Sequence, residues 1–393
     1  DYGSAQQQIE LLNGHLLHEA GFTGAGMRIA VLDAGFANAM ILEAFDSLYA
    51  ENRMVDAYDF VHNDTNVYDG GGGHGTSVLS TMAALNSGVM TGVAPHAEYA
   101  LYTTEDVSSE TRQEEYNWVF GSERADSLGC DIINTSLGYY EMDDPNESYT
   151  YEDMDGNTTV ITRAADIAAS RGLIVAASAG NTGFSSWQRI VAPCDGDSVF
   201  CVGGTNLNGV YVAFSGRGPS ADGRVKPNVV GAAAGVTVLT GSDVPTAGNG
   251  TSFSSPVMAG LLACVWQKFP FKNNVEVMQA VELISDQQYA PDSLRGYGLP
   301  NFQHIDWALS SDEPQMTMMD AEVFPNPTSG ELRVHCAACE EAIEWKLYDL
   351  TGKARSVGRT PSIGAIQVES PAGVYVLQLV SGQQQRFVRL IKE

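Results

Sequence analysis

Short apolar runs alternate with stretches of helical spacing along the first 309 residues. The runs lie at 27–32, 131–134, 172–177 and 199–202. Apolar residues recur at helical spacing in 76–86, 111–128, 160–170 and 252–268, with Pro256 expected in the first turn of the last helix. Apolar strands separated by helices are typical of βαβ units. The pattern therefore predicts an α/β fold with a central, mostly parallel sheet flanked by helices.

The pattern changes near residue 310. Residues 310–315 are polar and include Pro314, as linkers often do. Short apolar segments follow at 331–334, 344–348, 365–368 and 373–380, with turn signals between them. We therefore expect an α/β domain over 1–309, a linker over 310–320, and a small all-β, sandwich-like domain over 321–393.

The charge is strongly negative and unevenly distributed. The net charge is −27, and residues 1–310 hold 37 of the 48 acids and 13 of the 21 bases, or −24. Such acidity disfavours nucleic acid and anionic membranes as partners. No run of 18 apolar residues predicts a membrane-spanning segment, and the start at Asp1 without an apolar leader suggests a soluble mature form or a trimmed chain.

Six cysteines fall into two close pairs and two single residues. The pairs are Cys194/Cys201 and Cys336/Cys339, whereas Cys130 and Cys264 stand among apolar residues, as core cysteines do. Disulfides fit the close pairs if the protein is exported. A zinc site at Cys336 and Cys339 would need a second ligand pair that the nearby sequence lacks, so a local disulfide or free thiols fit better.

Three residues suited to nucleophilic catalysis stand at the ends of predicted elements. Asp33 ends the strand 27–32, His74 follows four glycines and opens a helical stretch, and Ser252 lies at the start of the helix 252–268. A serine nucleophile needs a histidine base, and that base needs a carboxylate to orient it. Asn181 ends another buried segment and offers an amide for a developing oxyanion, as does the helix terminus at Ser252.

Four segments give this set a family resemblance. Residues 31–35, 73–78, 179–181 and 250–256 resemble the motifs of the subtilisin-like (subtilase) family, in its order Asp, His, Ser, and the similarity covers about 20–309. It implies a secreted serine endopeptidase that works through an acyl-enzyme and requires no cofactor. In that reading Asp33, His74 and Ser252 form the triad and Asn181 part of the oxyanion hole.

The resemblance also implies a substrate-binding region and shows three departures. Ser136-Leu137-Gly138 resembles the family strand that pairs with substrate, and Ala179 and Gly180 flank the same groove. The departures are Ser77, where the family often has His, Phe253, where it often has Met, and Asn228, where it commonly has Asp; none supplies a catalytic atom. Val191-Ala192-Pro193 falls at the floor of the family's P1 pocket, and Val191 should disfavour large aromatic P1 side chains.

The C-terminal domain carries a second resemblance. Residues 324–327, 347–352, 372–376 and 389–393 resemble the sorting domain of the type IX secretion system of certain Gram-negative bacteria. This implies recognition by the secretion machinery, then removal of the domain or attachment at the cell surface. We expect a secreted or surface-attached protein.

A metal site is harder to place. Asp153, Asp155 and Asn157 alternate in a glycine-containing loop, as calcium ligands can, but the bidentate Glu of the full pattern is missing and a solvated loop fits better. The histidines other than His74 show no metal-ligand spacing. A structural calcium elsewhere in the domain stays open on acidity and family habit, and we assign no metal ligands.

Two other functions remain as alternatives. The protein could be a catalytically silent, surface-displayed peptide-binding protein of the same fold, with the acidic first domain as its interaction surface. It could also be a non-proteolytic acyl hydrolase that uses the same triad. The intact triad favours catalysis over the first, and the segment 136–138, which suits extended peptide, favours peptide over other acyl substrates.

Overall fold

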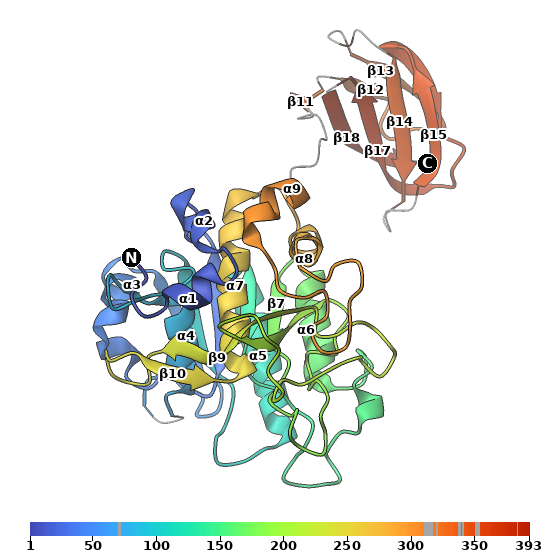
Figure 1. Cartoon of the computed structure of the whole chain (residues 1–393). Helices are drawn as coiled ribbons and strands as arrows, with labels where there is room; N and C mark the ends of the chain where they lie inside the picture. The colour runs from blue at the N-terminus through green and yellow to red at the C-terminus, as the bar shows by residue number, and fades with distance from the viewer. Residues whose placement is uncertain are drawn as a thin grey trace. The chain divides into compact units, whose positions relative to one another are not determined.

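The computed structural model describes residues 1–69, 72–309, 317–319, 321–336, 339, 342–349, 354–382 and 384–393. The chain divides into two compact units, Asp1–Leu309 and Ser310–Glu393 (Figure 1). Of the expected linker 310–320, only 317–319 fall within the described residues, and two glycines before His74 and the end of the motif 347–352 also lie outside them.

The first unit is built on an eight-stranded sheet with the order β10-β9-β8-β7-β6-β1-β5-β2. All neighbouring strands are parallel except β10, which runs antiparallel to β9. The strands are β1 (Arg28–Asp33), β2 (Met54–Asp59), β5 (Glu98–Thr103), β6 (Ile132–Thr135), β7 (Ile174–Ser178), β8 (Val199–Asn206), β9 (Val229–Val238) and β10 (Thr246–Asn249). The predicted α/β fold is confirmed.

Helices cover both faces of this sheet (Figure 1). They are α1 (Gln6–Glu10), α2 (His15–Glu19), α3 (Asp46–Ala50), α4 (His74–Ala83), α5 (Arg112–Leu128), α6 (Val160–Ser170), α7 (Thr251–Lys268), α8 (Asn274–Leu283) and α9 (Ile305–Leu309). Ile29 and Val31 of β1 join the core that includes α4 and α7, whereas Ala30 and Leu32 join the core with α5 and α6. Successive side chains alternate between the two faces, so a strand buried on both sides is apolar throughout.

Local signals explain where the predicted helices start and stop. Thr111 and Glu114 form a capping box before α5, and Gly129, at φ 74°, ends that helix in the left-handed conformation. The prediction for 76–86 began and ended too late, because α4 starts at His74 and Leu85–Asn86 forms β3, paired with β4 (Met90–Thr91). Pro256 lies in the second turn of α7 rather than its first, since the helix starts at Thr251.

Several elements were missed by periodicity. Strands β2 and β5 mix polar and apolar residues, because the outermost strand β2 is only half buried and β5 carries tyrosines. Helix α8 had a readable signal in the capping box of Asn273 and Glu276. Short strands whose neighbours come from distant parts of the chain give little local pattern.

The second unit is an all-β sandwich of two sheets. Its strands are β11 (Thr317–Met318), β12 (Glu322–Phe324), β13 (Glu331–His335), β14 (Ile343–Tyr348), β15 (Ala354–Thr360), β16 (Ile363–Gln367), β17 (Gly373–Ser381) and β18 (Gln384–Lys392). A five-stranded sheet, β11-β18-β17-β14-β15, faces a three-stranded one, β12-β13-β16. Leu332 and Ile366 of the smaller sheet share one core with Leu347, Leu377 and Leu390 of the larger. The strand predictions match β13, β14, β16 and β17.

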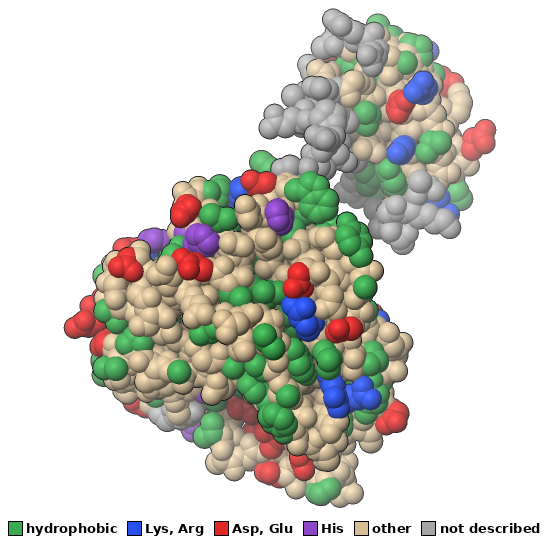
Figure 2. Space-filling model, in the orientation of Figure 1, with side chains coloured by type: hydrophobic (Ala, Val, Ile, Leu, Met, Phe, Trp, Pro, Cys, Tyr) green, Lys and Arg blue, Asp and Glu red, His purple; other side chains and the backbone are tan. Residues whose placement is uncertain are grey.

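The cysteines behave as expected. Disulfides join Cys194 to Cys201 and Cys336 to Cys339, while Cys130 and Cys264 are free and buried. The second disulfide leaves neither thiol available for zinc. Acidic side chains lie at the left and lower edges of the first unit in Figure 2. Within the described part of the chain, no helix combines the length and hydropathy needed to cross a membrane.

Candidate active site

The carboxyl edge of the parallel strands gathers the predicted site residues. Strand β1 ends at Asp33, β6 ends just before Ser136, and β7 ends shortly before Asn181. Helices α4 and α7 begin with His74 and Thr251, so His74 and Ser252 lie in first turns. Open parallel sheets place their sites at this edge, because the loops there converge from several strands.

Asp33 and His74 are joined directly. The Nδ1 atom of His74 lies 2.7 Å from Oδ1 of Asp33, whose side chain is fully buried. The Ala34 backbone N–H donates to the same oxygen at 2.8 Å. Gly75 permits this approach, since a Cβ there would lie 2.5 Å from the Gly35 carbonyl oxygen. Both contacts are made to Oδ1, whereas Oδ2 is buried and has no hydrogen-bond partner among the described residues.

The buried carboxylate changes the basicity of His74. The negative charge of Asp33 and its hydrogen bond raise the pKa of His74 above its ordinary value of 6.5, while burial of the ring opposes the rise. Glu105 adds a smaller contribution in the same direction as Asp33. The Phe253 ring lies 6.2 Å from the imidazole, between centroids. His74 is therefore a stronger base than a free imidazole.

Ser252 is tied to the end of β6 through its backbone. A helical residue normally donates its N–H to the carbonyl four positions earlier, but Pro256 has none to offer Ser252. The Ser136 hydroxyl donates to that carbonyl instead, at 2.8 Å. The Ser252 hydroxyl donates to the Ser136 carbonyl at 3.4 Å, and among the described residues no hydrogen bond joins it to His74.

Asn181 is oriented by the start of α7. Its Oδ1 accepts from the Thr251 N–H at 2.9 Å and from the Thr251 hydroxyl at 3.1 Å. The amide oxygen is used in this way, while the Nδ2 donor makes no hydrogen bond among the described residues, and Asn181 is exposed. Gly250, at φ 146°, makes the sharp entry into the helix that brings these groups together.

The expected substrate-binding segments lie on both sides of Val191. Ser136, Leu137 and Gly138 continue from β6, and Ala179 and Gly180 continue from β7. A Cβ atom added to Gly138 would lie 2.2 Å from the Cγ2 methyl carbon of Val191, and a Cβ atom added to Gly180 would lie 3.0 Å from the same carbon. Val191 is 3% exposed, so its side chain fills the space between the two backbones.

The loop at 153–157 does not gather cation ligands. The Asp153 carboxylate accepts from the Thr150 N–H and hydroxyl, and the Asp155 carboxylate accepts from the Asn157 and Thr158 N–H groups. Each carboxylate caps its own turn. The one acidic group among the described residues that could hold a metal consists of Glu105, Glu110 and Glu114, which the sequence reasoning did not single out.

The sequence reasoning also missed the surroundings of Asp33 on β5 and β2. Thr103 pairs with Asp33 on one side and with Asp59 on the other, which places the three residues in one row across the sheet. Glu105 follows in the next loop, and its Oε2 accepts from the Tyr139 hydroxyl at 2.6 Å. Nothing local predicts this row, because its members lie 26 to 70 positions apart and meet only through strand register.

Comparison with known proteins decides the family. The model of the subtilase family matches residues 24–298. The chain is 33% identical over 301 residues to subtilisin E of Bacillus subtilis, covering 75% of this chain and 69% of the relative. The chain belongs to the subtilase family. Subtilisin from Bacillus pumilus is also 33% identical, over 75% of this chain and 96% of the relative. This subtilase is a serine endopeptidase.

Solved structures agree in fold. MycP1 from Mycobacterium smegmatis superposes with a TM-score of 0.60 at 21% identity, covering 78% of this subtilase and 84% of that chain. The prenylagaramide maturation protease PagA gives a TM-score of 0.59 at 19% identity, over 76% and 98% of the two chains. At these identities the likeness shows the fold alone.

The second unit has its own match. Residues 322–393 match the secretion system C-terminal sorting domain, which agrees with the predicted type IX sorting domain. The subtilase is therefore a protein that is secreted or attached at the cell surface.

Proposed function

We propose that this subtilase cleaves peptide bonds with Asp33, His74 and Ser252 as its catalytic triad, through an acyl-enzyme. The observation that carries the proposal is the 2.7 Å bond between buried Asp33 and His74 at the sheet edge from which α7 presents Ser252. Asp33 fixes the imidazole so that Nδ1 carries the proton and Nε2 can act as the base. Nucleophile, base and orienting carboxylate all come from the chain, so catalysis requires no cofactor.

The reaction follows from these roles. The Ser252 hydroxyl turns from the Ser136 carbonyl to His74, which takes its proton as Oγ attacks the substrate carbonyl carbon. Such bonds are often long before substrate binds and tighten in the complex. The imidazolium, stabilised by Asp33, then gives the proton to the leaving amine and an ester remains on Ser252. Water, activated by the same histidine, hydrolyses the ester.

Asn181 would stabilise the charged intermediate. Its Nδ2 donor is directed by the two bonds that Thr251 makes to the amide oxygen. The N–H groups in the first turn of α7 have no partners within the helix, and they add positive potential at the same place. Charge on the substrate oxygen develops only as Ser252 attacks, so these donors act mainly on the transition state.

The substrate would bind as an extended strand along Ser136–Gly138 and the segment 179–180. This places the P1 side chain where Val191 already fills the space between Gly138 and Gly180. We expect alanine or serine at P1 and poor cleavage after phenylalanine or tyrosine. The sorting domain would engage the secretion machinery. Any calcium would be structural, because the proposed catalytic steps need no metal. The loop 153–157 is a poor calcium site, since its carboxylates accept hydrogen bonds from their own turns.

Labelling with a serine-directed phosphonate, followed by digestion of casein, tests the proposal. Wild type should be labelled by the phosphonate and should digest casein. It should also cleave a peptide with Ala at P1 faster than the same peptide with Phe at P1. Ser252→Ala should do neither yet still bind peptide, because it removes the nucleophile and little packing. Labelling without digestion would favour an acyl hydrolase. Absence of both in folded wild type would favour the peptide-binding protein.

A further inference from the structure

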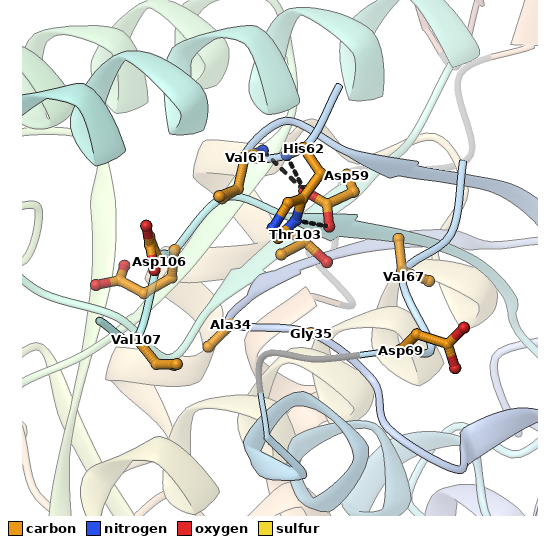
Figure 3. A pocket seen from close by; sticks show the side chains of 11 residues that line it. Ala34, Gly35, Asp59, Val61, His62, Val67, Asp69, Thr103, Asp106 and Val107 are labelled. Atoms are coloured by element: carbon orange, nitrogen blue, oxygen red, sulfur yellow. Dashed lines mark hydrogen bonds and ion pairs between the residues drawn. The ribbon is translucent and has the colours of Figure 1, made fainter. Parts of the chain in front are cut away.

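A small acidic cavity of about 40 Å³ lies just beyond the end of β1, the strand that finishes at Asp33 (Figure 3). It is lined by Ala34 and Gly35, which follow Asp33, and by residues from the ends of β2 and β5. Four of these are acidic, namely Asp59, Asp69, Glu105 and Asp106, and of the described residues that line it His62 alone is basic. None of the four has a role in the proposed catalytic steps.

The cavity has a defined place relative to the reacting groups. In the sheet order β7-β6-β1-β5-β2, Asn181 and Ser136 follow the first two strands and Asp33 ends the third. The cavity lies over β5 and β2, on the side of Asp33 away from Asn181. Neighbouring strands are about 4.8 Å apart and an extended peptide advances about 3.4 Å per residue. A peptide held at Ser252 therefore reaches the cavity within a few residues.

One polar group in the cavity has no partner in the protein. Thr103 is 4% exposed, and its hydroxyl makes no hydrogen bond among the described residues. Figure 3 shows this hydroxyl pointing toward the middle of the ring of lining side chains. A buried hydroxyl without a partner costs free energy, so it is a site that favours a ligand with a donor group.

The acids are arranged in two ways. Asp59 is committed to its own loop, because it accepts from the Val61 and His62 N–H groups at 2.8 and 2.9 Å and pairs with the His62 ring. Asp69 is exposed and Asp106 is half-buried, and the two lie on opposite sides of the cavity (Figure 3). Burial raises the pKa of Glu105 to about 8. Asp69 accepts from the Asn66 side-chain amide at 2.8 Å, and Asp106 accepts from the Ser108 N–H and hydroxyl at 3.0 and 2.7 Å, through one oxygen each. The second oxygen of each carboxylate is therefore the group available to an incoming ligand.

We propose that this acidic cavity binds the side-chain ammonium of a substrate lysine within about three residues of the scissile bond. The inference rests on the proposed function. An ammonium has three donors, which suit the Thr103 hydroxyl together with the carboxylates of Asp69 and Asp106. The small volume favours this compact group over the planar guanidinium of arginine.

Quenched peptides with alanine at P1 test the proposal. Lysine is placed at one position at a time and compared with norleucine, which has the same chain without the charge. At one position lysine should raise kcat/KM about tenfold, as expected for a charge-assisted contact. Asp69→Asn/Asp106→Asn and, separately, Thr103→Val should reduce this preference and leave cleavage of the norleucine peptides unchanged. Asp126→Asn, an exposed acid near the far end of α5, is the matched control and should keep the preference.

The outcomes separate this inference from the function it rests on. Equal cleavage of lysine and norleucine peptides at every position, or a preference that survives the double variant and Thr103→Val alike, would overturn the cavity's role. Wild type that cleaves neither peptide would instead defeat the proposed function. A lysine preference that a chelator abolishes and calcium restores would assign the cavity to a metal ion rather than to substrate.

Discussion

At the scale of the residue, the Asp33–His74 bond sets the pH dependence. Only neutral His74 can accept the Ser252 proton, and the pKa of His74 is raised above 6.5, first by the charge of Asp33. We expect kcat/KM to fall as the pH drops, with a midpoint above 6.5. The same pair stabilises the folded state below pH 6.5, and this contribution is lost as the pH rises through the raised pKa.

A pH–rate profile measured on one peptide checks this. Asp33→Asn should lower the midpoint as well as the maximal rate, because it removes the charge that raises the pKa. A rate that stays constant between pH 5 and pH 9 would remove His74 from the role of base.

Asn181 should act on the rate rather than on binding. Asn181→Ala removes one transition-state donor, and such a loss lowers kcat by about 10²–10³, the cost known for this kind of donor in subtilisin, a member of the same family. KM should change little, since the substrate carbonyl carries little charge before attack. Measuring both constants on one peptide decides the matter. A higher KM with an unchanged kcat would assign Asn181 to substrate binding instead.

Much of this site could be predicted from the sequence, because the motifs around Asp33, His74, Asn181 and Ser252 are local. The structure brings Asp33 and His74 together as that reasoning expected, and it adds the partners that local patterns do not contain. The Thr251 bonds that orient Asn181 join residues 70 positions apart. The row through Thr103 depends on strand register, which sequence periodicity leaves open.

At the scale of the element, Pro256 and Ser136 should be energetically coupled. Ser136→Ala leaves the Ser252 carbonyl without its donor, at a cost of about 1–3 kcal/mol in the free energy of unfolding. In a Pro256→Ala background the new N–H of residue 256 can donate to that carbonyl, so Ser136→Ala should cost less. Urea unfolding in the Ser252→Ala background, which should not digest itself, measures the difference. Additive effects of the two substitutions would show that the carbonyl does not depend on Ser136.

Elements with a strong apolar period or a capping signal, such as α5 and β7, were predicted nearly to the residue. Strands β2 and β9 were not, because they pair with β5 and β8, which lie far away along the chain, and show no clear local alternation. The predicted start of α4 was two residues late because His74 and Gly75 contribute no apolar side chain to the first turn. Functional positions are where local pattern and structure disagree most.

At the scale of the whole molecule, we expect catalysis to depend on the first unit and sorting on the second. The residues proposed for catalysis and substrate binding all lie in the unit Asp1–Leu309, whereas the sorting match begins at residue 322. A chain that ends at Leu309 should keep the kcat/KM of the full chain on a short peptide, but should fail to be exported. Assays of purified protein and of cell fractions check the two halves of this prediction. If the shortened protein folds and loses peptide cleavage, the second unit contributes to the site.

The uneven charge bears on how the protease treats copies of itself. Residues 1–310 carry 37 acids and 13 bases, so two catalytic units repel each other over about 10 Å in 0.1 M salt and over longer distances in more dilute solution. Encounters between copies are slowed, while encounters with neutral or cationic proteins are not. We therefore expect self-digestion to speed up when salt is added, whereas cleavage of a short neutral peptide does not. A protein rich in acids is then a poor substrate for its own kind, which favours its survival after export.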